Sequence, residues 1–202
     1  MEETVATGCV VKLDRGFPLV RLEDGRELRC KHATSLVKGE RVRAVIGDRV
    51  RVSFAERNDK ALIVEVLPRS RELVRKDPTE RAVPQVLAAN FDRVIVTQPS
   101  TEVNMRRLER ELVLAHETGA AVSVVLTKAD LAESEDEVAR VRERVLALVG
   151  ADVETLVVSE ATPESVEAVR ALVPEGTTAV LIGRSGVGKS SLVNLLVGRD
   201  VQ

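Results

Sequence analysis

The chain has 202 residues, of which 44% are hydrophobic, so it is long enough for one medium domain or two small ones with real cores. Its 30 Lys and Arg residues nearly cancel its 32 Asp and Glu residues, and the overall charge argues neither for nor against a polyanionic partner. No apolar run approaches the roughly 20 residues that cross a bilayer, and the start MEETVATGCV lacks the features of a signal peptide, so we expect a soluble, cytoplasmic protein.

The first third of the chain alternates short β-type runs with turn residues. The runs are TVATGCVVKL, FPLVRL, RELRCKHA, IGDRVRVSF and KALIVEVL. Five strands in so short a segment predict a small closed barrel over residues 1–68. The charged segment that follows is broken by Pro68, Pro78 and Pro84, so we interpret residues 69–84 as a connector.

From residue 85 onward the pattern becomes one of apolar strands alternating with helices. The strand runs DRVIVT, AVSVVLT, VETLVVS and TAVLI are of the kind found in strands buried on both faces. Between them lie helical stretches with one apolar stripe: Met105, Leu108, Leu112 and Ala115 in the first, and Val138, Val141, Val145 and Leu148 in the second. This alternation predicts a parallel sheet covered by helices.

A glycine-rich stretch, GRSGVGKSSL, follows the last predicted strand and leads into a helix. Glycines let such a loop turn its backbone N–H groups inward around a phosphate, at the positive end of the helix. Lys189 then supplies a mobile cation for the β- and γ-phosphates, and the Ser190 hydroxyl is a ligand for Mg²⁺. The alternative is a turn that merely begins a helix, but the strand, the loop, the Lys-Ser pair and the helix are all in register.

The tetrapeptide TKAD, residues 127–130, ends a predicted strand and concerns the choice of base. The Asp130 carboxylate can accept hydrogen bonds from the N1–H and N2–H₂ edge of guanine, which adenine lacks. The stem of Lys128 would lie across the base, and the backbone after Ser159 would face guanine O6. Taken alone, TKAD fits a helix N-cap with solvated charges better than it fits a base-reading motif. Its weight comes from sharing one sheet edge with the phosphate loop.

In the usual order of a GTPase the phosphate loop precedes the base-reading loop, whereas here TKAD comes first. The domain therefore looks circularly permuted, an arrangement that is possible when the original chain ends lie close together. With GDRVRV, IVEVLPRSRELVR and LAANFDRVIV as further matches, the chain resembles the circularly permuted, ribosome small-subunit-dependent GTPases of the RsgA/YjeQ family.

The resemblance implies an all-β OB-fold barrel followed by an α/β P-loop GTPase domain over residues 85–202. It also implies binding of GTP or GDP with Mg²⁺, GTP hydrolysis, contact with ribosomal RNA, and a role in late maturation of the small (30S) ribosomal subunit. The expected nucleotide-binding residues are Thr127, Lys128, Ala129, Asp130, Ser159, Glu160, Ala161, Gly183, Arg184, Ser185, Gly186, Val187, Gly188, Lys189, Ser190 and Ser191. Of these, Lys189 is the expected catalytic residue and Ser190 the expected metal ligand.

Three departures from the family pattern matter. Thr127 stands where the family has Asn, which would loosen the link to the phosphate loop, and Glu160 replaces a small residue near guanine O6. Only 12 residues follow Ser190, without the family's water-positioning segment or its zinc site, so we expect a truncated chain. The alternative function is therefore an rRNA-binding assembly factor fragment that binds guanine nucleotide weakly and does not hydrolyse it. A P-loop ATPase or kinase is a more remote alternative.

The predicted barrel is an RNA-binding candidate without the usual stacking residues, since the sequence has three Phe and no Trp or Tyr. Basic side chains would instead contact phosphates of folded RNA, unless they form an ordinary solvated surface. They are Arg21, Arg26, Arg29, Lys31, Arg41, Arg43, Arg49 and Arg51. We expect a monomer whose partner is the small ribosomal subunit, with no membrane association.

Overall fold

The computed structural model describes residues 4–14, 17–40, 42–54, 61–75 and 85–198. The chain divides into two compact units, Met1–Asn90 and Phe91–Gln202, which are considered separately below. Among the helices of the described residues, none is both long enough and apolar enough to span a membrane.

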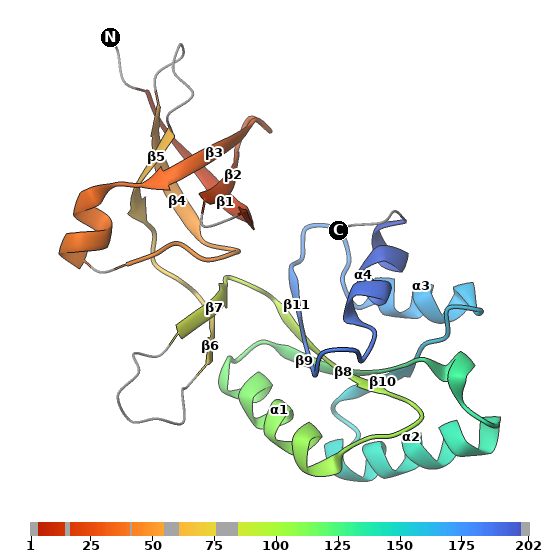
Figure 1. The fold of residues 1–202 in the computed structure, drawn as a ribbon. Helices are drawn as coiled ribbons and strands as arrows, with labels where there is room; N and C mark the ends of the chain where they lie inside the picture. The colour runs from red at the N-terminus through yellow and green to blue at the C-terminus, as the bar shows by residue number, and fades with distance from the viewer. Residues whose placement is uncertain (1–3, 15–16, 41, 55–60, 76–84, 199–202) are drawn as a thin grey trace. The chain divides into compact units, whose positions relative to one another are not determined.

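The first unit contains a closed barrel of five strands (Figure 1). The strands are β1 (Thr4–Asp14), β2 (Phe17–Leu22), β3 (Glu27–His32), β4 (Arg49–Phe54) and β5 (Ala61–Val66). They neighbour one another in the order β1-β2-β3-β5-β4, and β1 closes the barrel by pairing with both β2 and β4. Only the β3–β5 pair of this barrel is parallel. The barrel predicted from the five β-type runs is thus confirmed.

Because successive side chains point to opposite faces of each strand, every second one enters the barrel, and small aliphatic side chains fill its interior. The residues that are at most 1% exposed include Val10, Val20, Cys30, Val50, Val52 and Ile63. The short helix η1 (Ser35–Glu40) lies between β3 and β4, and its Leu36 also packs into this core. Both cysteines are free thiols.

A two-stranded hairpin completes the first unit. It consists of β6 (Glu72–Arg75) and β7 (Gln85–Ala89), which pair antiparallel, and the sequence pattern did not predict it. Strand β6 lies within the segment interpreted as a connector, and residues 76–84 of that segment lie outside the described residues. Asn90, directly after β7, accepts a hydrogen bond from the Ser70 N–H at 2.8 Å and donates one to the Gly47 carbonyl at 3.0 Å.

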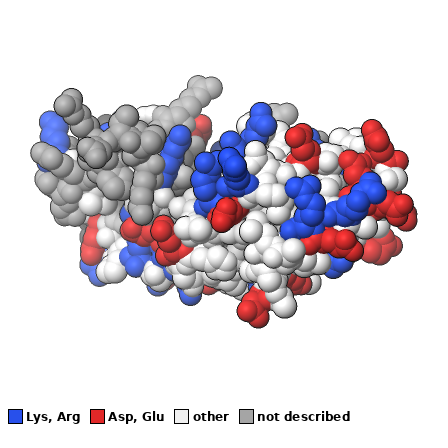
Figure 2. Space-filling view, turned by 90° about the horizontal axis from the view of Figure 1, so that it is seen from below, with Lys and Arg blue, Asp and Glu red and all other residues white. Residues whose placement is uncertain are grey.

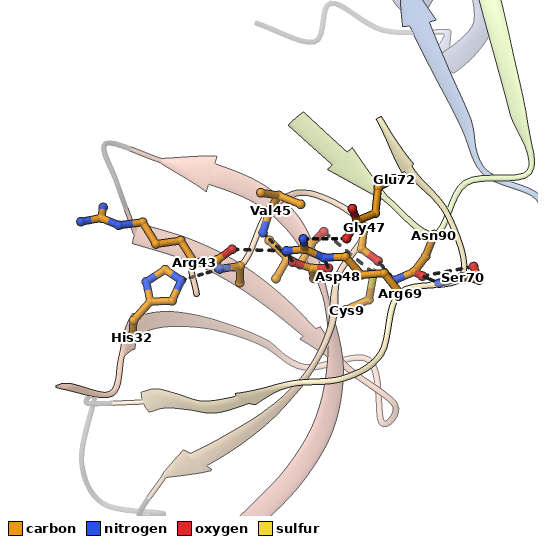
Figure 3. Close-up of polar contacts among 12 residues, drawn as sticks. Cys9, His32, Arg43, Val45, Gly47, Asp48, Arg69, Ser70, Glu72 and Asn90 are labelled. Carbon is orange, nitrogen blue, oxygen red and sulfur yellow. Dashed lines mark hydrogen bonds and ion pairs between the residues drawn. The ribbon is translucent and has the colours of Figure 1, made fainter. Parts of the chain in front are cut away.

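A buried ion pair joins the hairpin's entry to the barrel (Figure 3). The Arg69 guanidinium donates to both oxygens of the Asp48 carboxylate, at 2.7 and 2.8 Å, and the Val45 N–H donates to the same carboxylate at 2.7 Å. Asp48 is completely buried, and Arg69 makes a further bond to Glu72. The hydrogen bond to Asp48 raises the pKa of Arg69, as expected for a buried charge that is fully paired.

The second unit is built on a four-stranded parallel sheet, as the sequence predicted. Its strands are β8 (Arg93–Pro99), β9 (Ala121–Thr127), β10 (Glu154–Val157) and β11 (Ala179–Ile182). They lie in the order β10-β9-β8-β11, with every neighbouring pair parallel. Strand β11, which leads into the phosphate loop, is thus last in the sequence but pairs with β8, the first strand of the sheet.

Helices cover both faces of this sheet (Figure 1). They are α1 (Met105–Glu117), α2 (Glu135–Val149), α3 (Pro163–Ala171) and α4 (Lys189–Val197). On one face α1 buries Leu108, Leu112 and Ala115, three of the four residues in its predicted stripe. On the other face Ile95 and Val125 pack against α3 and α4.

The predicted stripe of α2 is only partly correct. Val141 and Val145 are buried, but Leu148 is 39% exposed. Leu148 lies in the last turn, two residues before the C-cap Gly150, and α2 packs on β10, the short strand at the sheet's edge. On the face drawn in Figure 2, basic and acidic side chains are interspersed rather than separated into fields of one sign.

Candidate functional site

Three loops meet at the carboxyl edge of the parallel sheet. Residues 128–131 follow β9, residues 158–162 follow β10, and residues 183–188 follow β11. Backbone hydrogen bonds continue beyond the strands: the Val158 N–H donates to the Leu126 carbonyl at 2.7 Å, and the Ala129 N–H donates to the Val158 carbonyl at 3.2 Å. The first two loops are therefore held side by side at the edge where α/β sheets bind their ligands.

The phosphate loop is shaped by glycines that no other residue could replace without strain. Gly183 has φ +144°, and a Cβ on it would lie 2.4 Å from the Thr97 carbonyl oxygen of β8. Gly188 has φ +96°, and a Cβ there would approach the Thr127 hydroxyl at 3.3 Å. The loop thus runs against the ends of β8 and β9, and only glycine permits that approach.

Lys189 folds back over the loop from the first position of α4. Its ammonium donates to the carbonyls of Gly183 and Arg184, at 2.8 Å each. Gly188 caps α4 without a side-chain hydrogen bond, so the first N–H groups of this nine-residue helix have no side-chain partner at the cap. A mobile cation over a loop that opens a helix in this way is the arrangement that holds a phosphate chain.

Thr127 links the TKAD loop to the glycine-rich loop. This side chain is 4% exposed, and its hydroxyl lies 2.5 Å from the Val187 carbonyl and 3.2 Å from the Gln98 carbonyl. The hydroxyl thus reaches the glycine-rich loop directly, and the expectation that Thr gives a looser connection than Asn stays a prediction. The next residue, Lys128, has φ +62° and ψ +35°, a left-handed conformation that costs energy for a residue with a side chain.

Asp130 of the TKAD loop and Glu160 of the loop after β10 contact each other. The Glu160 N–H donates to the Asp130 carboxylate at 3.3 Å, and both residues are exposed. Ser159 turns its loop locally, since its hydroxyl accepts from the Ala161 N–H at 3.1 Å. The structure therefore brings the TKAD loop against both the phosphate loop and the loop after β10, as the sequence-based hypothesis requires.

The remaining predicted residues are also on this rim. Arg184, Ser185 and Gly186 form the exposed crest of the phosphate loop, and Ser190 and Ser191 are exposed in the first turn of α4. The described residues contain no group of three or more His, Cys, Asp or Glu that could hold a metal ion. The Ser190 hydroxyl offers a single oxygen donor, which suits Mg²⁺ only if phosphate oxygens and water complete its shell.

A polar pair beneath the rim was missed by the sequence-based prediction. Gln98, at the end of β8, is 2% exposed and donates to the Glu111 carboxylate of α1 at 2.5 Å. Burial raises the pKa of Glu111, although Arg107, the bond from Gln98 and Lys189 oppose this. A glutamine inside the apolar run VIVTQP was the available signal. Nearby, the buried hydroxyls of Thr97 and Ser100 have no hydrogen-bond partner within the described part of the chain.

Most of the candidate RNA-binding cations of the barrel are paired with acidic neighbours. The exposed pairs are Arg21–Glu27, Arg26–Asp24, Arg29–Asp14, Arg49–Glu23 and Arg51–Glu65. Arg29 and Lys31 also lie over the Phe17 ring, each 5.7 Å from its centroid. Arg41 lies outside the described residues. These contacts reduce the positive charge that the barrel presents, without removing the side chains from the surface.

Comparison with known proteins gives the family that the sequence motifs resemble, and the matches extend across both units. The family model described as RsgA GTPase matches residues 66–202. A protein of Streptomyces avermitilis named "Small ribosomal subunit biogenesis GTPase RsgA" is 38% identical, over 98% of this chain and 53% of its own length. One of Methanosarcina acetivorans with the same name is 35% identical, over 78% of this chain and 42% of its own length. The chain thus spans about half the length of the curated relatives it matches.

Solved structures show the same architecture. YjeQ from Thermotoga maritima superposes with a TM-score of 0.74 at 25% identity, covering 98% of this chain and 68% of YjeQ. YloQ, described as a circularly permuted GTPase, superposes with a TM-score of 0.69 at 21% identity, covering 95% of this chain and 64% of YloQ. The predicted fold, a barrel followed by a permuted α/β domain, is confirmed by these neighbours and by the strand order.

Proposed function

The chain belongs to the RsgA GTPase family, and on that premise we propose that it binds guanine nucleotide at the sheet rim of residues 85–202. As part of the whole protein it would hydrolyse GTP during biogenesis of the small ribosomal subunit, with residues 1–68 contacting ribosomal RNA. The observation that supports the nucleotide-binding proposal is the contact of Thr127 with Val187, which holds the TKAD loop against the glycine-rich loop.

Each loop supplies one part of nucleotide recognition. The amides of Gly186 to Ser191 and the Lys189 ammonium would hold the β- and γ-phosphates, exchanging the carbonyls that Lys189 now contacts for phosphate oxygens. Asp130 would accept the N1–H and N2–H₂ donors of guanine. The backbone after Ser159 would face O6. In this proposal Lys189 stabilises the charge of the transferring phosphoryl group.

Mg²⁺ would be held at the phosphate loop through the Ser190 hydroxyl. That hydroxyl is exposed in the first turn of α4, one residue after Lys189. Since Mg²⁺ prefers an octahedral shell of oxygens and keeps several waters, one protein ligand is compatible with phosphate oxygens supplying others. When bound, the ion would neutralise charge on the β- and γ-phosphates.

A titration with fluorescent GDP and ADP tests the nucleotide assignment. We expect GDP to bind in preference to ADP and Lys189→Ala to abolish binding. Asp130→Asn should shift the preference from GDP to xanthosine diphosphate, because an amide N–H can donate to the C2 oxygen of xanthine whereas a carboxylate cannot. Equal affinity for GDP and ADP, or an unchanged preference in Asp130→Asn, would refute the role of Asp130. Binding of GTP without phosphate release would support the non-hydrolysing alternative for this chain.

Contact with ribosomal RNA is proposed through phosphate-directed cations of the barrel. Arg29 and Lys31 lie over the Phe17 ring, so this ring is poorly suited to base stacking. Docking on folded RNA is therefore favoured. We expect the chain to bind purified small ribosomal subunits with an affinity that decreases as salt is added. Because several of the predicted cations are paired with acidic side chains, this decrease should be smaller than if all of them were unpaired. Binding that is insensitive to salt and to Lys31→Glu would contradict this interface.

A further inference from the structure

We propose that Glu111 of α1 is a positioning residue that sets how strongly Lys189 attracts phosphate. Its carboxylate acts through Lys189, by offsetting part of the positive charge at the glycine-rich loop, and does not itself bind the nucleotide. The inference rests on the proposed function, because it concerns the phosphate half of the same site.

The first observation is that the Glu111 side chain is fixed in place. Its carboxylate accepts a hydrogen bond from the side-chain amide of Gln98 at 2.5 Å. Gln98 is 2% exposed, and its own carbonyl lies 3.2 Å from the Thr127 hydroxyl. Because its partner is buried at the end of β8, the Glu111 carboxylate has a defined position there.

The second observation is that this end of β8 adjoins the start of the glycine-rich loop. Strand β11, which leads into the loop, pairs in parallel with β8. A Cβ on Gly183 would lie 2.4 Å from the Thr97 carbonyl oxygen, so the backbones of loop and strand are in contact. The Lys189 ammonium donates to the Gly183 carbonyl at 2.8 Å. Glu111 and Lys189 are therefore bonded to neighbouring parts of the backbone, one from α1 and the other from α4.

The third observation is that no close cation neutralises the Glu111 charge. Within the described residues its carboxylate forms a hydrogen bond with Gln98 but no ion pair. Burial raises the pKa of Glu111, whereas nearby cations and this hydrogen bond lower it. Those cations are Arg107, Lys189 and Arg110. Arg107 and Arg110 belong to α1 itself, whereas Lys189 acts on the carboxylate from α4, and the carboxylate must act equally on Lys189.

The phosphates of a nucleotide would interact with both of these charges. Lys189 attracts phosphate and Glu111 repels it, and each interaction energy is proportional to the phosphate charge. Glu111→Gln removes the negative charge but keeps a side-chain oxygen that can accept from Gln98. The affinity should therefore rise, and it should rise more for GTP than for GDP. Loss of a merely structural contact would instead lower the affinity for both.

The experiment is a calorimetric titration without added Mg²⁺, so that the full phosphate charge is present. It compares Glu111→Gln with the unchanged chain, using GDP, GTP and inorganic tripolyphosphate. At low salt we expect the variant to bind GDP about threefold and GTP about tenfold more tightly. Tripolyphosphate, which has no base, should also bind more tightly, and added salt should reduce all three gains.

Two further variants isolate the effect of the charge. Glu109→Gln is the matched control, because Glu109 is exposed on the same helix and lies two residues from Glu111, on a different face. It should leave all three affinities unchanged. Glu111→Ala removes the charge without supplying an amide, and it should give gains in the same order as Glu111→Gln. Thermal unfolding of each variant, followed by circular dichroism, shows which of them are folded.

Two results would overturn the proposal. One is unchanged or weaker binding of GTP and tripolyphosphate by the folded Glu111 variants. The other is an equal gain in Glu109→Gln, which would reduce the effect to overall charge. If the unchanged chain binds tripolyphosphate but does not prefer GDP to ADP, the guanine assignment fails, while tripolyphosphate still tests the role of Glu111. Absence of binding for every ligand in every variant would refute both the proposed function and this inference.

Discussion

Replacing Thr127 with Val removes the hydroxyl that joins the base-reading loop to the phosphate loop, while keeping the shape of the side chain. The hydroxyl lies within reach of two carbonyls, those of Val187 and Gln98, but it carries one proton and serves one of them at a time. The loss is therefore one hydrogen bond plus a carbonyl left unpaired at Val187, a residue only 5% exposed. Such a change costs about 1–3 kcal/mol.

The cost should appear in two measurements. The unfolding temperature of the second unit should fall by about 4 °C for each kcal/mol lost, which calorimetry can detect. GDP affinity should fall by about tenfold, because part of the binding energy must restore the loop's geometry. The sequence contains no Trp or Tyr, so a fluorescent GDP analogue must be excited directly.

Thr127→Ser is the matched control, because it keeps the hydroxyl and removes only a methyl group. We expect Thr127→Ser to retain most of the GDP affinity that Thr127→Val loses. Suppose instead that the unchanged chain, the Thr127→Val variant and the Thr127→Ser variant have equal GDP affinities and equal unfolding temperatures. That result would refute the reasoning, since the hydroxyl would then contribute nothing to the connection between the loops.

Three further predictions concern the barrel unit. Asp48→Ala should destabilise it by about 3–5 kcal/mol in calorimetry, because the Arg69 guanidinium, whose side chain is 14% exposed, would lose its buried counter-charge. Burial raises the pKa of the Cys30 thiol to about 11, so thiol reagents at pH 8 should modify it only on unfolding, and barrel stability should fall as the pH rises from about 9 to about 11. Burial lowers the pKa of His32, whose Nε2 accepts from the Ala44 N–H at 2.9 Å. Barrel stability should therefore fall as the pH drops below about 6.5, and a His32→Asn variant should lose that dependence.

The local sequence predicted most of the strands and the glycine-rich loop at the carboxyl edge of the parallel sheet. Alternating apolar residues predicted the five barrel strands, and continuous apolar runs predicted the four strands of the parallel sheet, because strand periodicity is a local property. The glycines and Lys189 of the phosphate loop were likewise evident, since backbone torsions and residue chemistry decide that motif within a few residues. The β6–β7 hairpin was not predicted, because the prolines and charges around it are typical of a connector.

Contacts between distant segments were decided only by the tertiary structure. Nothing in TKAD indicates that the Thr127 hydroxyl reaches Val187, or that Asp130 pairs with the Glu160 N–H, since these contacts depend on how β9, β10 and β11 are placed in one sheet. Asp48 and Arg69 are paired for the same reason, across the entry to the hairpin. Periodicity determines which residues form strands, but strand order and register determine which polar groups meet at the edge of the sheet.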